Sequence, residues 1–125
     1  MIVYACSDLI FSTKVRSTGE SLNLPMRQVR SVEALDARLH QVDDGYLNEP
    51  VWAVLIDLDL GDSGLALIEH AHGHDPHLPI VAFGSHVETD ILQAAQDRGA
   101  TVMPRGQFVQ HVTQHAGPFA VEAAA

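Results

Sequence analysis

The chain has 125 residues, 46% of them hydrophobic and 18% charged, and a formal net charge of −9. The length provides one globular core and is too short for two, and the composition excludes an intrinsically disordered chain. The negative charge argues against direct nucleic-acid binding, because phosphates are neutralised by Lys and Arg, and no apolar run approaches the ~18 residues of a membrane-spanning helix.

The cysteine content and the N-terminal sequence indicate a reducing compartment. Cys6 is the only cysteine, so no internal disulfide can form. The first residues do not combine a basic segment with an apolar stretch, as a secretory signal would. We therefore predict a cytoplasmic protein.

Short apolar runs alternate with helical patterns along the chain. In chain order they predict a strand at 2–6, a helix at 9–17, a break at 19–25, a strand at 26–29, a helix at 32–42, a strand at 52–56, a helix at 64–72, a strand at 79–83, a helix that ends at 96, a strand at 100–103 and a helix at 107–115. We predict one domain over residues 1–117 and a loose tail over residues 118–125.

Polar residues and glycine mark the ends of several of these helices. Ser31 is predicted to cap the second helix. Ser85 and Glu88 form a capping box for the fourth helix, and Gly99 follows its end as a C-cap. Residues 52–56 are apolar throughout, which is typical of a strand buried on both faces.

Five strands that alternate with helices predict an α/β fold with a five-stranded parallel sheet, because each parallel crossover needs a helix. The flavodoxin-like strand order 2-1-3-4-5, with helices on both faces, suits this length. The site of such a sheet lies beyond the carboxyl ends of strands 1 and 3. The loops at residues 6–8, 57–64 and 84–85 are therefore the candidate functional positions, followed by the corner at residues 104–105.

Three segments carry a resemblance to a known family. Residues 55–60 read LIDLDL, with SGL at residues 63–65 in the loop after them, residues 79–83 read PIVAF, and residues 98–100 read RGA. In this order the segments resemble the receiver domains of two-component response regulators, and the resemblance covers residues 2–115. It implies a receiver-like fold and makes Asp57, at the end of the third strand, the phosphoacceptor candidate.

The resemblance also implies an acidic site for Mg²⁺, which neutralises the charge on the phosphoryl oxygens during transfer to the aspartate. The acidic pair at the end of the first strand falls on Cys6 and Ser7, which are poor ligands for this ion. Asp8, one position further on, is acidic, so Asp8 and Asp57 are the weak candidates for a Mg²⁺ site. Asp59 lies in the loop after Asp57, and this loop is one residue shorter than the family pattern. We expect no required cofactor.

Two supporting positions depart from the family pattern as well. The hydroxyl position at the end of the fourth strand falls on Gly84, with Ser85 next to it. The position of the fifth-strand lysine holds no lysine, and the nearest cation is Arg105, which follows Pro104. Arginine supplies a positive charge, but with a different geometry from lysine.

Three functions remain open at this point. The first is an atypical receiver domain, a non-enzymatic protein-interaction module in signal transduction that works without ordinary Mg²⁺-dependent aspartyl phosphorylation. Its partner would be a signalling protein, either a histidine kinase or an output protein, and a homodimer is a further option. We expect neither nucleic acid nor membrane as a direct partner.

The second function is a working response regulator that uses Asp57, Asp8, Ser85 and Arg105 in an altered geometry. The third is a small metal-binding protein or an enzyme that uses the same crevice. Neither a phosphate-binding glycine loop nor a nucleophile elbow supports the enzyme.

Several residues have a structural interpretation beside the functional one. Asp57 could simply cap the turn that follows it. Cys6 is either a reactive thiol at the crevice or a small buried apolar side chain. The histidines at 70, 72, 74 and 77 could hold a metal through the i, i+4 pair His70 and His74, respond to pH, or lie at a solvated helix end.

The segment from His40 to Asp97, both included, contains eleven acidic residues and no Lys or Arg. Such a segment could form an acidic face for a basic partner, or it could be a solvated surface that keeps the domain in solution.

Overall fold

The computed structural model describes residues 1–7, 9–21, 23, 25–40, 42–43, 46–47, 50–84 and 89–104. In chain order the elements are β1 (Ile2–Ala5), α1 (Leu9–Ser21), β2 (Met26–Gln28), α2 (Val32–Leu39), β3 (Val42–Asp43), β4 (Tyr46–Leu47), β5 (Ala53–Asp57), the 3-10 turn η1 (Leu58–Leu60), α3 (Asp62–His74), β6 (Ile80–Gly84), α4 (Thr89–Asp97) and β7 (Thr101–Pro104). No helix in these ranges is long and apolar enough to cross a membrane.

Five strands form one parallel sheet in the order β2-β1-β5-β6-β7. This order confirms the predicted arrangement 2-1-3-4-5, with β5, β6 and β7 as the third, fourth and fifth strands. All residues of β1, β5 and β6 are buried. A strand that is covered on both faces needs a continuous apolar run. For this reason, the bounds predicted for these three strands lie close to the observed ones.

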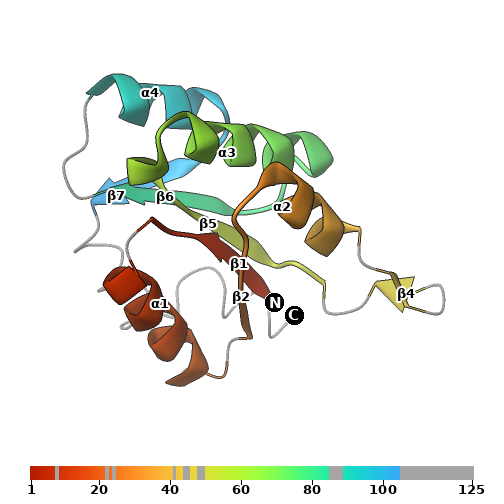
Figure 1. Ribbon diagram of the computed structural model, residues 1–125. Helices are drawn as coiled ribbons and strands as arrows, with labels where there is room; N and C mark the ends of the chain where they lie inside the picture. The colour runs from red at the N-terminus through yellow and green to blue at the C-terminus, as the bar shows by residue number, and fades with distance from the viewer. Residues whose placement is uncertain are drawn as a thin grey trace.

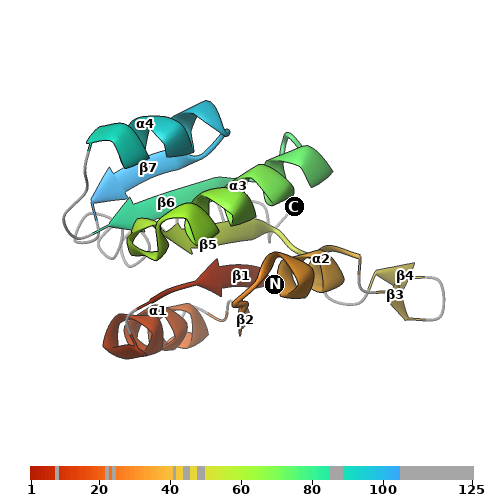
Figure 2. The same cartoon turned by 45° about the horizontal axis from the view of Figure 1, so that its top comes forward.

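The two faces of the sheet carry separate hydrophobic clusters. Helices α2, α3 and α4 cover one face and α1 packs on the other, as Figures 1 and 2 show. Side chains alternate between the two faces along each strand. In β1, for example, Val3 and Ala5 belong to the cluster under α2 and α3, whereas Ile2 and Tyr4 belong to the cluster on the α1 side.

Helix α2 begins as the sequence predicts and ends earlier. The Ser31 hydroxyl accepts a hydrogen bond from the backbone N–H of Ala34 at 3.0 Å, which is the predicted cap. The predicted end at residue 42 is wrong, because α2 ends at Leu39 and the chain then forms the antiparallel pair β3 and β4. This hairpin extends beyond the end of α2 (Figure 2).

Other boundaries shift by a few residues. Helix α1 runs through Gly19 to Ser21, so the predicted break at residue 19 is wrong. A single glycine costs a helix only about 1 kcal/mol and does not end it. Helix α3 extends two residues beyond its predicted range at each end. The predicted helix at 107–115, the capping box at Ser85 and Glu88 and the tail lie outside the described residues.

Gly99 follows α4 in a conformation that other residues rarely adopt. Its φ is 103° and the N–H of Ala100 donates to the carbonyl of Ala95 at 3.1 Å, which is a C-terminal capping arrangement. A Cβ at this position would overlap the His72 ring. We expect Gly99→Ala to lower the free energy of unfolding by more than about 1 kcal/mol, measured by urea denaturation.

Gly73→Ala is the matched control for this prediction. Gly73 lies inside α3, and a Cβ there would meet no atom within 4 Å. Alanine should therefore stabilise this helix by about 0.5–1 kcal/mol. Equal stability of Gly99→Ala and the unmodified chain would contradict the proposed role of the positive φ.

Candidate functional site

Asp57 lies at the centre of the carboxyl edge of the sheet. It is the last residue of β5, its side chain is fully buried, and it is in register with Phe83 of β6. Strand β1 pairs with β5 on the other side, so the residues after β1 reach the same point. The buried position follows from the sequence, because residues 53–56 form the most apolar strand and carry Asp57 at their end.

One carboxylate oxygen of Asp57 accepts hydrogen bonds from the loop after β1. The backbone N–H of Ser7 donates to Oδ2 at 3.0 Å, and the Ser7 hydroxyl donates to the same atom at 2.8 Å. The half-buried Cys6 thiol also donates to Oδ2, with Sγ at 3.4 Å. Three donors from two residues therefore compensate the removal of this oxygen from water.

The other oxygen holds the turn that follows the strand. The backbone N–H of Asp59 donates to Oδ1 of Asp57 at 2.9 Å, and Asp57 is the N-cap residue of η1. This contact confirms the capping role that the sequence suggested for Asp57. The Asp59 residue itself is exposed, and its part in this contact is the backbone N–H.

Gly64 allows α3 to begin close to the buried aspartate. A Cβ on Gly64 would lie 3.1 Å from the backbone oxygen of Asp57 and 3.2 Å from Cγ2 of Ile56. Both distances are tighter than ordinary van der Waals contact, so a larger residue would push the first turn of α3 away from β5. The SGL segment of the sequence thus sets the spacing between strand and helix.

Several solved structures are similar to this chain over most of its length. No protein-family model and no curated protein sequence matches the chain. The structure of NtrX from Brucella abortus in complex with ADP is similar, with 17% identity and a TM-score of 0.72, over 98% of this chain and 26% of that chain. A CheY-like response regulator receiver domain protein from Methanospirillum hungatei has 14% identity and a TM-score of 0.72, over 98% of this chain and 95% of that chain.

A response regulator receiver protein from Pseudoalteromonas atlantica matches along the full length of both chains, with 18% identity and a TM-score of 0.69. The chain has the receiver fold. The chain spans about a quarter of the length of NtrX, so the likeness to that protein concerns one part of it.

Within the receiver fold, the described residues do not fit a Mg²⁺ site. Magnesium requires oxygen ligands in octahedral geometry, and at the end of β1 the side chains are a thiol and a hydroxyl that both donate to Asp57. Among the described residues, no three His, Cys, Asp or Glu side chains are placed to hold a metal ion. Asp8, the remaining acidic candidate, lies outside the described residues.

The receiver positions on the fourth and fifth strands are partly described. Gly84 is buried at the end of β6 and pairs with Pro104 of β7. Because this residue is glycine, no side chain stands where the receiver pattern has a hydroxyl group. Ser85 and Arg105, the two neighbouring candidates, lie outside the described residues. The structure thus brings together Asp57, Cys6 and Ser7 from the sequence-predicted set.

A cavity of about 230 Å³ next to Cys6 adds Arg30, a residue that the sequence interpretation did not single out. Arg30, after β2, and Ser63, in the first turn of α3, line this cavity together with Cys6. The signal was available in the predicted strand order, because strand 2 lies beside strand 1 and its carboxyl end must approach the same edge.

Proposed function

We propose that the chain is an atypical receiver domain that acts in signal transduction as a protein-interaction module, without ordinary Mg²⁺-dependent phosphorylation of Asp57. The observation that carries this proposal is the use of the Asp57 carboxylate. Its Oδ2 accepts hydrogen bonds from Cys6 and Ser7, residues at the positions where the receiver pattern has an acidic pair. Asp57 is therefore a structural residue that ties the end of β1 to the end of β5.

The chemistry of aspartyl phosphorylation supports the same proposal. A carboxylate oxygen must attack the phosphorus atom while cations neutralise the charge on the transferred oxygens. Donors that hold the Asp57 oxygens lower their availability for attack, and a thiol and a hydroxyl replace the expected carboxylate ligands. Both effects act against phosphoryl transfer.

The expected partner is a signalling protein, either a histidine kinase or an output protein, and the domain itself is non-catalytic. The acidic segment between His40 and Asp97 favours a partner with a basic surface, because complementary charge speeds association. A second copy of the chain is a further partner within this proposal. The chain would act in the cytoplasm.

The proposal is tested by incubating the protein with Mg²⁺ and acetyl phosphate and measuring its intact mass, beside Asp57→Asn. A receiver domain with a complete acidic site, treated in parallel, shows that the phosphodonor is active. We expect no phosphate adduct on either form of this chain, because the charge-neutralising ligands at Cys6 and Ser7 are absent.

A phosphate adduct on the unmodified chain that is lost in Asp57→Asn would overturn the proposal. It would establish the second function, a working response regulator that uses Asp57 in an unusual site. An adduct that persists in Asp57→Asn would place the phosphate elsewhere and leave the structural role of Asp57 intact. Circular dichroism spectra of both forms must match, so that a missing adduct is not a consequence of unfolding.

A further inference from the structure

The groove between α2 and α3 gathers ionisable side chains that lie away from the Asp57 site. It has a volume of about 750 Å³, and Asp36, His40, Glu69, His70 and His74 are among its lining residues. Asp57 lies beside the first turn of α3, whereas His74 is the last residue of this helix. His74 is twelve residues after Asp62, so it lies about 18 Å along the helix from the start of that first turn.

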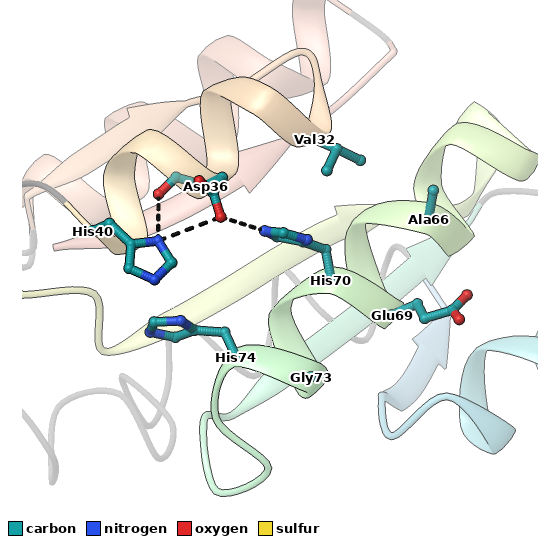
Figure 3. A pocket seen from close by; sticks show the side chains of 8 residues that line it. All are labelled: Val32, Asp36, His40, Ala66, Glu69, His70, Gly73 and His74. Carbon is teal, nitrogen blue, oxygen red and sulfur yellow. Dashed lines mark hydrogen bonds and ion pairs between the residues drawn. The ribbon is translucent and has the colours of Figure 1, made fainter.

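The side chains come as two pairs with helical spacing. Asp36 lies in α2 and His40, four residues later, is the C-cap of that helix, whereas His70 and His74 are four residues apart on α3. Residues at this spacing project from the same face of a helix. Because α2 and α3 pack against one another, the two pairs face each other across the groove (Figure 3).

Asp36 determines which ring nitrogens of its neighbours carry hydrogen. Nδ1 of His40 lies 3.2 Å from the backbone oxygen of Asp36 and 3.3 Å from its Oδ1, and both are acceptors. Nε2 of His70 lies 2.8 Å from the same Oδ1. Each neutral ring therefore carries its hydrogen on the nitrogen that faces Asp36, and the other nitrogen has a free lone pair.

The rings of His40 and His74 meet across the groove. Their centroids are 4.7 Å apart at an interplanar angle of 86° (Figure 3). Two imidazoles that bind one tetrahedral zinc ion, with Zn–N bonds of about 2.0–2.1 Å, have their ring centroids about 5 Å apart. The centroid separation of His40 and His74 is therefore close to that of two imidazoles on one ion.

We propose that this groove binds one divalent transition-metal ion, with His40 and His74 as ligands and Asp36 as the residue that orients His40. Metal-binding histidines commonly donate the other ring N–H to a carboxylate or a backbone carbonyl, which is the arrangement of His40. Water completes the coordination, since His40 has a side-chain exposure of 59% and His74 is exposed as well.

The number of ligands defines the kind of site. No three His, Cys, Asp or Glu side chains within the described ranges are placed around a common point, so this is a two-histidine site and not a closed structural zinc site. His70 remains bound to Asp36, and Glu69 pairs with Arg98, with Oε2 3.6 Å from Nε. Imidazole ligands favour zinc, nickel and copper over magnesium.

The site joins the ends of two helices. His40 is the C-cap residue of α2 and His74 the last residue of α3, so a bound ion would cross-link them. An ion that binds only the folded chain also raises the free energy of unfolding, with the logarithm of its concentration once this exceeds the dissociation constant.

The test is a calorimetric titration of metal-free protein with Zn²⁺ at pH 7.5, beside the variants His40→Ala, His74→Ala and His77→Ala. We expect one ion per chain, with an affinity at least tenfold lower in the first two variants. His77 lies outside the groove, so His77→Ala controls for the loss of one histidine near the end of α3 and should bind as the unmodified chain does. Millimolar Mg²⁺ should not compete.

Two further measurements distinguish metal binding in this groove from binding at Asp57 or at other residues. Asp57→Asn should bind zinc unchanged, so the result is independent of the proposed function at that residue. His40→Gln retains a polar side chain at an exposed position, and it replaces His40→Ala in the titration if His40→Ala does not fold. Cobalt(II) bound by nitrogen ligands should give a visible absorption band that is lost in His40→Gln.

Absence of stoichiometric zinc binding would overturn the proposal. So would binding that falls equally in His77→Ala, or binding that survives in both His40→Ala and His74→Ala, because either result would indicate adventitious binding at other histidines.

Discussion

Replacement of Phe83 by alanine is expected to lower the free energy of unfolding by about 3–5 kcal/mol. Phe83 lies in β6 with 1% of its surface exposed, in the cluster that also contains Tyr4, Leu55 and Val81. Removal of the ring takes away its transfer free energy and leaves a cavity that rigid neighbouring strands cannot fill. Urea denaturation followed by circular dichroism measures the loss.

Phe83→Leu is the control, because it retains most of the apolar volume and should cost less than about 1.5 kcal/mol. If Phe83→Ala lost less than 1.5 kcal/mol as well, the cluster on this face would have to collapse around the vacated space. That result would contradict tight packing of the cluster that contains Phe83.

Asp57→Asn is expected to destabilise the fold by about 1–3 kcal/mol, although the two side chains have the same shape. Both oxygens of Asp57 accept hydrogen bonds, from Ser7 and Cys6 on one side and from Asp59 on the other. An amide retains one acceptor and turns the other into an NH₂ donor. In either orientation, a donor of the amide must face a donor of the protein, and one of the contacts is lost.

Ser7→Ala tests the same network from the other side. It removes the hydroxyl that donates to Oδ2 at 2.8 Å and leaves the Ser7 backbone N–H in place, so we expect a loss of about 1 kcal/mol. Urea midpoints and slopes of both variants provide the comparison. Higher stability of Asp57→Asn than of the unmodified chain would mean that the cost of burying the charge exceeds the gain from its hydrogen bonds.

The sheet and the position of Asp57 could be predicted from the sequence because their signals are local. Residues 53–56 are buried on both faces and must be apolar, and the aspartate that ends the run stands out against them. The strand order then follows from general rules of parallel connections. The capping role of Asp57 was also accessible, since aspartate commonly accepts from the N–H two residues further on.

The remaining features depend on tertiary contacts or on weak local signals. Strands β3 and β4 have two residues each, which is too short for any hydrophobic period. The pairing of His40 with His74 depends on how α2 packs against α3, and spacing along one helix suggested His70 with His74 instead. For Cys6 and Asp57, the sequence predicted only that their two loops meet at one edge of the sheet, and not that the two side chains are in contact.

The strand order has a consequence for the way in which the chain folds. Strand β1 lies between β2 and β5, and its partner in β5 is far along the chain, with Ile2 opposite Ala53. A nascent chain that ends before β5 has one neighbour for β1 and no cover for its inner edge, so it cannot retain the native sheet. Long-range pairing of this kind closes large loops before contacts form, and we expect this domain to fold more slowly than a helical bundle of equal length.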